Sequence, residues 1–258
     1  MSRTTVLLVA IFCLILGPST GLAQGLYVTA NVGYGLSAGT QRIGYNLDNK
    51  GTTPSYEGIY GSYGEGFKFG ASAAYMFNKN IGAELGVAYW LGNTFETENK
   101  SATSSLKDKY SGSGFVGVPS IVLAVPMGGV SPYARLGLVL GIMTVKQETI
   151  WEETSVNEVI REETGHLAFG YAGAFGISIP AGGIMDFFAE ATLHSVNYSP
   201  AQQELTKYTV NGVDRLPTIE DKVIDYKDSF DTGETNTSLA VRRPFSSIGV
   251  GVGVRINL

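Results

Sequence analysis

The chain has 258 residues, including 34 glycines, 14 tyrosines and one cysteine, and its formal net charge is −5 at pH 7. The excess of acidic residues argues against nucleic acid as a partner. A single cysteine excludes a disulfide framework within the chain. High glycine and tyrosine content with few long helix formers is typical of an all-β protein.

The first 23 residues have the pattern of a secretory signal peptide. Arg3 gives a short positive region, residues 6–16 form an apolar core, and residues 21–23 place small side chains at the cleavage positions. We expect cleavage after Ala23, which removes Cys13 and leaves residues 24–258 as one barrel domain without a thiol. No later stretch has the roughly 20 consecutive apolar residues of a membrane-spanning helix.

Strict alternation of bulky apolar and small residues is the dominant pattern of the remaining chain. In the first run, Leu26, Val28 and Ala30 share one row, and the residues between them form the other row. A period of two predicts β-strands, because successive side chains of a strand point to opposite faces. We predict strands over 26–36, 67–77, 81–91, 113–125, 133–142, 166–179, 186–194 and 248–258.

The fourth of these predicted strands, 113–125, is the least regular. Both of its rows are apolar, so alternation does not assign its faces. Pro119 within it lacks the N–H group that a strand ladder uses. We therefore expect a β-bulge near Pro119, which would bring this strand into line with the others.

The two rows of the regular strands differ in chemistry, and this difference predicts which row faces lipid. The bulky row has no charged residue, whereas the other row is mostly glycine, alanine and serine. A soluble barrel would instead turn its bulky row inward. We expect the bulky row outside, where Leu138→Arg would impair insertion by about 2–4 kcal/mol. Gly137→Ser, in the inner row, is expected to be milder.

Connection lengths support an up-and-down barrel. Short connections, at 78–80, 127–131 and 181–183, alternate with long ones at 37–64, 93–109, 146–165 and 199–237. Such alternation is typical of a transmembrane antiparallel β-barrel with short periplasmic turns and long extracellular loops. We predict an all-β barrel of about eight strands in the bacterial outer membrane.

Two long loops contain hairpin patterns. Residues 145–153 and 159–164 are expected to extend two strands beyond the membrane around a turn near 157–158. Asn211-Gly212 is a two-residue hairpin signal. Charged residues next to it (Lys207, Asp214 and Arg215) would keep that hairpin out of lipid, so eight strands are favoured over ten.

Two motifs carry a resemblance to a known family. The run 251–258 resembles the C-terminal assembly signal of outer-membrane barrels, with Gly253, Ile256 and Leu258 at its key positions. The run 131–137, Ser-Pro-Tyr-Ala-Arg-Leu-Gly, resembles the strand-opening motif of OmpA/OmpX-like "porin family" outer-membrane β-barrel domains. The resemblance implies a packed lumen and a family that mostly anchors, adheres or stiffens rather than catalyses.

The partners expected for such a protein follow from this reading. They are the lipids of the outer membrane, the barrel assembly machinery and an unknown extracellular ligand. Nucleic acid is not expected as a partner, and the protein is expected to be a monomer.

Four charged residues fall in the inner rows: Glu84, Arg135, Glu190 and Arg255. Strand positions place three of them at a similar height, with Glu190 about three residues higher. Two acids and two bases in a narrow interior are expected to pair, because an unpaired buried charge is heavily penalised. Such a cluster resembles the OmpA lumen. It is either a gate or a structural plug, and the narrow lumen of eight strands favours the plug.

We expect no catalytic, cofactor-binding or metal site. Lipid A deacylases of this shape use a His and a Ser two residues apart on the lipid-facing side. Here Val196 stands two residues after His194, Ser195 faces the opposite way, and His194 is predicted to point inward. Six acidic residues of the third long loop are expected on a solvated hairpin rather than in a calcium cage: Glu148, Glu152, Glu153, Glu158, Glu162 and Glu163.

Three functions remain open from the sequence. The favoured one is a non-enzymatic barrel that anchors or contacts other surfaces through its extracellular loops. The alternatives are a small pore for ions or small solutes and a lipid A-modifying hydrolase. Loops are where the specificity of the favoured function would lie.

Overall fold

The structure is a computed structural model that describes residues 25–51, 53–127, 129–231 and 233–258. The predicted signal peptide, residues 1–23, lies outside the described residues. The described chain consists of β-strands and one short 3-10 helix, η1 (Leu216–Thr218). Within these ranges, no helix has the length and apolar character needed to cross a membrane.

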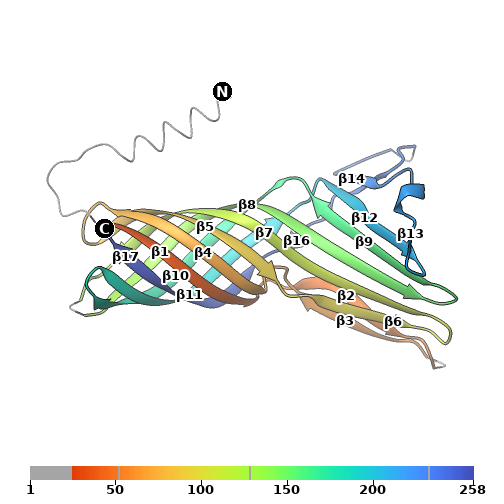
Figure 1. Cartoon of the computed structure of the whole chain (residues 1–258), viewed down its shortest axis with the longest axis horizontal. Coiled ribbons are helices and arrows are strands. Elements are labelled where there is room, and N and C mark those ends of the chain that lie inside the picture. The colour runs from red at the N-terminus through yellow and green to blue at the C-terminus, as the bar shows by residue number, and fades with distance from the viewer. Residues whose placement is uncertain (1–24, 52, 128, 232) are drawn as a thin grey trace.

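Eight long strands form a closed antiparallel barrel (Figure 1). Each pairs with the next long strand along the chain, and the first and last pair with each other to close the ring. The predicted all-β up-and-down barrel is therefore confirmed. The strands are β1 (Leu26–Ser37), β4 (Gly66–Met76), β5 (Ile81–Gly92), β7 (Ser105–Ala124), β8 (Ser131–Glu152), β10 (Leu167–Gly182), β11 (Met185–Tyr198) and β17 (Ser247–Asn257).

Shorter strands continue the structure beyond one end of the barrel, together with the outer parts of β7 and β8 (Figure 1). The short turns and the C-terminus lie at the opposite end, so the predicted sorting of connections is confirmed. The shorter strands are β2 (Gln41–Asp48), β3 (Ser55–Gly61), β6 (Phe95–Lys100), β9 (Val156–Thr164), β12 (Gln202–Val210), β13 (Val213–Asp214), β14 (Val223–Lys227), β15 (Thr237–Leu239) and β16 (Arg243–Pro244).

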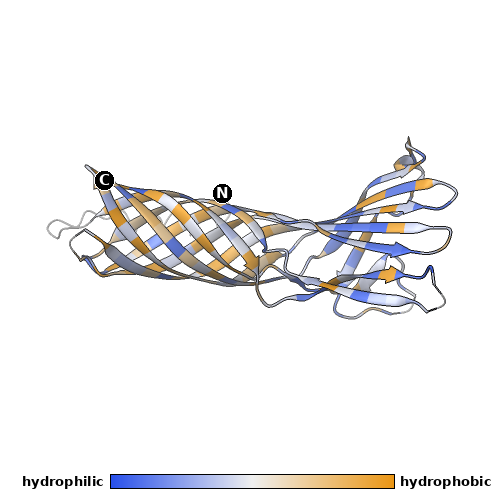
Figure 2. Cartoon of the chain, turned by 90° about the horizontal axis from the view of Figure 1, so that it is seen from below, coloured by the Kyte–Doolittle hydropathy of each residue, from blue (hydrophilic) through white to orange (hydrophobic). Residues whose placement is uncertain are grey.

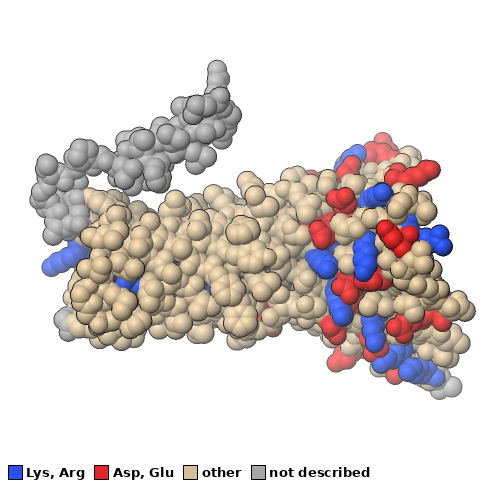
Figure 3. All heavy atoms as spheres, in the orientation of Figure 1, with Lys and Arg blue, Asp and Glu red and all other residues tan. Residues whose placement is uncertain are grey.

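The bulky row of the barrel strands faces outward, as predicted. Leu136 is 68% exposed on the outside of β8, whereas Val139 on the inner row is 0% exposed. In Figure 2 hydrophobic residues are interspersed along all the barrel strands, whereas hydrophilic residues make up a larger share of the extension. In Figure 3 the visible face of the cylinder is almost free of charged side chains, which begin where the extension begins. This distribution matches a surface that contacts hydrocarbon.

The predicted bulge near Pro119 is wrong. Gly117 pairs with Leu140 and Ser120 pairs with Gly137, so the β7–β8 register is the same on both sides of the proline. On the other edge, Pro119 itself pairs with Leu85 within an unbroken run. The missing N–H of proline removes a ladder hydrogen bond toward one neighbour only, and no extra residue is needed to accommodate that loss.

Both predicted hairpins form. The β8–β9 turn lies at residues 153–155, between the paired Glu152 and Val156, and not near 157–158 as predicted. The turn between β12 and β13 is at Asn211 and Gly212, whose φ angles are 49° and 79°. Two positive φ angles are what a tight two-residue hairpin turn requires, which explains the Asn-Gly pair.

The structure shows that Gly137 has little room for the serine of Gly137→Ser. A Cβ atom added at Gly137 would lie 2.6 Å from the carbonyl oxygen of Pro119, closer than real Cβ contacts allow. By contrast, a Cβ atom at Gly86, also on an inner row, would meet nothing nearer than 3.7 Å. A serine at Gly137 is therefore expected to force the strands apart, whereas Gly86 has room for a serine.

Candidate functional site

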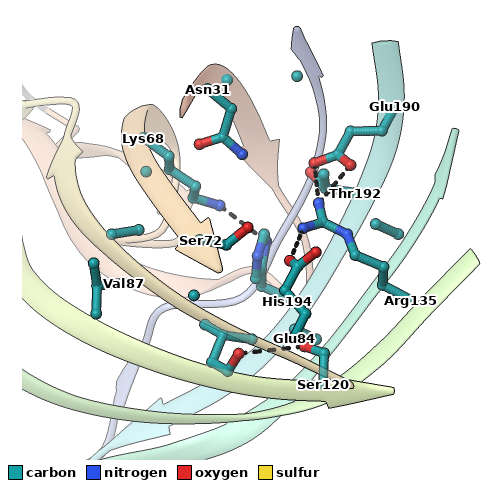
Figure 4. Close-up of a pocket in the computed structure, with 18 of the residues that line it drawn as sticks. Asn31, Lys68, Ser72, Glu84, Val87, Ser120, Arg135, Glu190, Thr192 and His194 are labelled. Carbon is teal, nitrogen blue, oxygen red and sulfur yellow. Dashed lines mark hydrogen bonds and ion pairs between the residues drawn. The ribbon is translucent and has the colours of Figure 1, made fainter. Parts of the chain in front are cut away.

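The Arg135 guanidinium lies between two carboxylates inside the barrel (Figure 4). Its Nη1 donates to Glu84 and its Nη2 donates to Glu190. Both acids are 6% exposed. The inner-row positions predicted a cluster of these three residues together with Arg255, and the structure brings Glu84, Arg135 and Glu190 together. Each buried carboxylate thus has a cationic partner, which offsets the cost of removing its charge from water.

Two tyrosines donate hydrogen bonds to this group from the side of the short turns. The hydroxyl of Tyr27 donates to Glu84 at 3.2 Å, and that of Tyr133 donates to Glu190 at 2.8 Å. Sequence reasoning missed both tyrosines, although each lies on the inner row of its strand near the end of the barrel with the short turns. The two hydroxyls supply hydrogen bonds that two charged groups in a dry interior need.

Arg255 does not join the two glutamates, so its predicted pairing is wrong. Its guanidinium carbon lies 4.3 Å from the ring centroid of Tyr27 and 5.3 Å from that of Tyr133. Its Nη1 lies 4.0 Å from the carboxylate of Asp186. Arg255 and Asp186 are direct cross-strand partners between β17 and β11, which gives Arg255 a nearer acid than either glutamate.

A second polar group lies above the first, toward the extension. The Nζ atom of Lys68 lies 3.3 Å from Nδ1 of His194 (Figure 4). The same Nζ donates to Ser247 and lies 4.4 Å from the ring centroid of Trp90. His194 points inward, as predicted. Sequence reasoning missed this group because it placed Lys68 on the inner row of its strand without connecting it to distant strands.

The two polar groups border a cavity of about 110 Å³. Its middle is lined by small residues, among them Gly33, Gly70 and Gly86, and by the amide of Asn31. At roughly 30 Å³ per water molecule, this space holds a few waters. The lumen is therefore packed except for a small polar cavity.

Aromatic side chains fill the mouth of the barrel beneath the extension. Tyr63, Tyr198 and Phe245 are almost completely buried, and their ring centroids lie 5.7 Å (Tyr63–Phe245) and 6.0 Å (Tyr198–Phe245) apart. They belong to one apolar cluster with Trp90 and inward residues of β7, β8, β10 and β11. We call Tyr63, Tyr198 and Phe245 the aromatic plug. Backbone hydrogen bonds from Tyr63 to Pro244 and from Phe245 to Val196 hold it in place.

A buried ion pair fastens the extension above this plug. Nε of Arg243 donates to Glu163 at 2.6 Å, and the hydroxyl of Tyr226 donates to the same carboxylate at 2.9 Å. Glu163 is 2% exposed. The expected solvated hairpin therefore needs a correction at this residue, which is a buried structural partner and not a surface charge. No local pattern revealed this contact, because Arg243 is 80 residues away in the chain.

This cluster predicts a loss of stability in alkali. Burial, followed by the neighbouring Glu163 carboxylate, raises the pKa of Tyr226 to about 12. The folded chain therefore keeps a proton that the unfolded chain loses near pH 10, so stability falls as the pH rises from 10 through 12. Near-ultraviolet circular dichroism during an alkaline titration measures this loss. Tyr226→Phe should reduce its amplitude, and an unchanged amplitude would contradict the assignment.

The predicted assembly signal lies on the last barrel strand. Gly253 pairs with Asn31 and Ile256 with Val28 across the β1–β17 seam that closes the barrel. Leu258 follows the strand and is 69% exposed. Recognition of these residues by the assembly machinery remains a prediction.

In the described parts of the chain, no three His, Cys, Asp or Glu side chains are grouped as a metal site requires. The contact between Lys68 and Ser247 resembles a nucleophile and base, the minimum for acyl transfer. Ser247 is 0% exposed.

Comparison with known proteins places the chain in a family. The sequence model of the outer membrane protein beta-barrel domain matches residues 5–213. The chain belongs to this family. No curated protein sequence matches this barrel-domain protein significantly.

Two solved structures are similar to this barrel-domain protein. The first is Neisserial surface protein A, with 14% identity over 90% of this chain and 97% of that chain and a TM-score of 0.37. The second is Ail, the attachment invasion locus protein of Yersinia pestis, with 14% identity, the same coverages and a TM-score of 0.32. A likeness at this level concerns the fold alone.

Proposed function

We propose that this outer-membrane barrel is non-enzymatic and non-conducting, and that it acts by presenting a folded extracellular surface for adhesion-like contact. The observation that carries the proposal is the extension itself. Strands β7 and β8 are 20 and 22 residues long, far more than the 9–11 residues that cross a bilayer. The Glu163–Arg243 pair fastens the structure above the plug. A fixed extramembrane surface suits recognition better than flexible loops would.

One face of the β2–β3 hairpin is the best candidate for the contact surface. Tyr45 pairs with Gly58, and Tyr56 and Tyr60 lie two residues to either side of that glycine. The three tyrosines therefore share a face, and they are 42%, 68% and 63% exposed. Exposed aromatic clusters mark interaction sites, because tyrosine offers a large, rigid contact area at low entropic cost.

The pore alternative is disfavoured by the packing of the lumen. Solutes would have to pass both the aromatic plug and the Arg135 group. We expect no single-channel conductance from the refolded mature protein in planar bilayers. Regular conductance steps from the wild-type protein would overturn the non-conducting part of the proposal.

The hydrolase alternative is disfavoured by the position of its residues. His194 faces the lumen and contacts Lys68, while Ser195 is exposed on the other face of β11. Val196 is fully buried. We expect expression of the protein to leave the mass of lipid A unchanged, and a mass shift would contradict the non-enzymatic assignment.

The adhesion-like role is tested with cells that display the protein. Wild-type cells should be retained on at least one surface in a panel of arrayed glycans, immobilised fibronectin and immobilised laminin. The double variant Tyr56→Ser/Tyr60→Ser should lose most of that retention. Val213→Ser, an exposed residue of the β12–β13 hairpin, is the matched control and should retain it. If cells with the double variant are still retained, the tyrosine face of the β2–β3 hairpin is not the contact surface.

A further inference from the structure

A polar pocket lies on the outside of the protein where the extension meets the barrel. It has a volume of about 310 Å³ and spans β7, β8 and the start of β6. Its lining combines two ammonium groups, two hydroxyls and two carboxylates: Lys109, Lys146, Ser111, Thr94, Glu96 and Glu148. Neither the plug nor the tyrosine face of the hairpin includes any of these residues.

The strand register shows that this pocket opens on the lipid-facing side. The β7–β8 pairing keeps one register along its whole length, from Ser105 opposite Glu152 to Ala124 opposite Tyr133. Lys146 therefore shares the outer face of β8 with Ile142, which is 66% exposed. By the same alternation, Lys109 shares the outer face of β7 with Phe115. The pocket is thus continuous with the apolar surface of the barrel.

The pocket lies at and just beyond the outer limit of the polar layer of the membrane. Lys146 lies four residues beyond Ile142 and Lys109 lies six residues beyond Phe115, which correspond to about 10 Å and about 15 Å along the membrane normal at about 3.3 Å per residue and 40° of tilt. The polar layer adds about 5–8 Å on each side of the hydrocarbon core. Lysine side chains also reach several ångströms toward such a layer. Only small hydroxyl residues lie between the lysines and the last apolar residues: Ser111, Ser113 and Thr144.

The lysines of the pocket are available to a ligand. Nζ of Lys109 lies 3.8 Å from Glu96, and Nζ of Lys146 lies 4.0 Å from Glu148. Both distances exceed a hydrogen bond, so the ammonium groups keep donors for another acceptor. The side chains of the two lysines are 40% and 42% exposed.

The carboxylates influence which phosphate can bind. Glu96 and Glu148 line the pocket, and Glu162 stands opposite Lys146 in the β8–β9 register. A free anion gains little at a site of such mixed charge. A phosphate anchored in the leaflet beside the pocket is present at high effective concentration, and a weak site then suffices.

We propose that this pocket binds a phosphate group of the phosphorylated glycolipid of the outer leaflet, lipopolysaccharide. Lys109 and Lys146 donate to the phosphate oxygens, and the hydroxyls of Ser111 and Thr94 add neutral donors. The site would fix the rotation and depth of the barrel in the membrane, because it lies on one side of the cylinder, over three neighbouring strands.

The test compares the refolded mature protein in phosphatidylethanolamine liposomes with and without lipopolysaccharide. The measurement is the midpoint of heat-dependent gel mobility. Lipopolysaccharide should raise the midpoint of the wild-type protein, and Lys109→Gln/Lys146→Gln should lose at least half of that rise. Lys227→Gln is the matched control, because Lys227 is an exposed lysine paired with Glu234 on the extension, and it should keep the full rise.

Two results would overturn the proposal. One is a full lipopolysaccharide-dependent rise in the double variant. The other is an equal rise when inorganic phosphate replaces lipopolysaccharide, because the pocket would then be a free-anion site. Should the double variant fail to refold, each single variant is measured instead. Native mass spectrometry then provides a second readout, since each single variant should retain fewer lipopolysaccharide molecules than the wild-type protein.

Discussion

Replacing Arg135 with methionine is expected to destabilise the barrel by about 3–5 kcal/mol, the range for removing one partner of a buried ion pair. The side chain of Arg135 forms ion pairs with two carboxylates, those of Glu84 and Glu190, and both glutamates are 6% exposed. Its removal leaves two like charges in one narrow lumen without the cation that contacts them. The measurement is the urea midpoint of the refolded protein in detergent micelles, followed by tryptophan fluorescence.

A compensated variant separates the loss of charge from the loss of packing. Glu84→Gln and Glu190→Gln, added to Arg135→Met, remove all three charges and should recover most of the lost stability, because a neutral group of similar volume replaces each charged one. If Arg135→Met unfolds at the wild-type midpoint, the three residues do not form a buried cluster in the folded protein.

Leu138→Arg is the second change with a large expected effect, about 2–4 kcal/mol against the inserted state. Leu138 is 41% exposed on the outer face of β8, in the middle of the apolar surface. An arginine there places a charge in hydrocarbon. The yield of heat-modifiable protein after refolding into liposomes measures the effect.

Gly86→Ser is the matched control for Leu138→Arg. It introduces a polar side chain on the inner row, where the structure leaves room for it. Its refolding yield should stay close to that of the wild-type protein. Equal losses for the two variants would mean that lipid does not distinguish the two rows.

The strands could be predicted because their determinants are local. Alternation identified the barrel strands and the faces of all the predicted runs except 113–125, whose two rows are both apolar, and connection lengths gave the topology. Pro119 was misread because a proline in a strand has two physical outcomes, a bulge or a single missing hydrogen bond, and only the register of both neighbours distinguishes them. The β8–β9 turn was predicted a few residues too late in the chain. Both strands are polar near the turn, so alternation does not show where one strand ends and the next begins.

The candidate site was predictable only where inner rows bring charges to one height. That rule brought Glu84 and Arg135 together, and Glu190, expected about three residues higher, also contacts Arg135. The rule placed Arg255 in the same cluster wrongly, because it ignored Asp186 directly across the strand pair. The contacts of Lys68 with Ser247 and of Glu163 with Arg243 were not predictable. They depend on how strands and loops distant in the sequence meet in the closed barrel, and a single sequence carries no local signal for such contacts.

The account depends on which row of the barrel strands touches lipid, and photolabelling from within the membrane tests this most directly. The wild-type protein is refolded into liposomes that contain a diazirine lipid, and labelled residues are located by mass spectrometry. The account predicts label on Phe115, Leu138 and Ile142 and none on Val116, Val139 and Met143. Label on the second set, or on both sets equally, would contradict it.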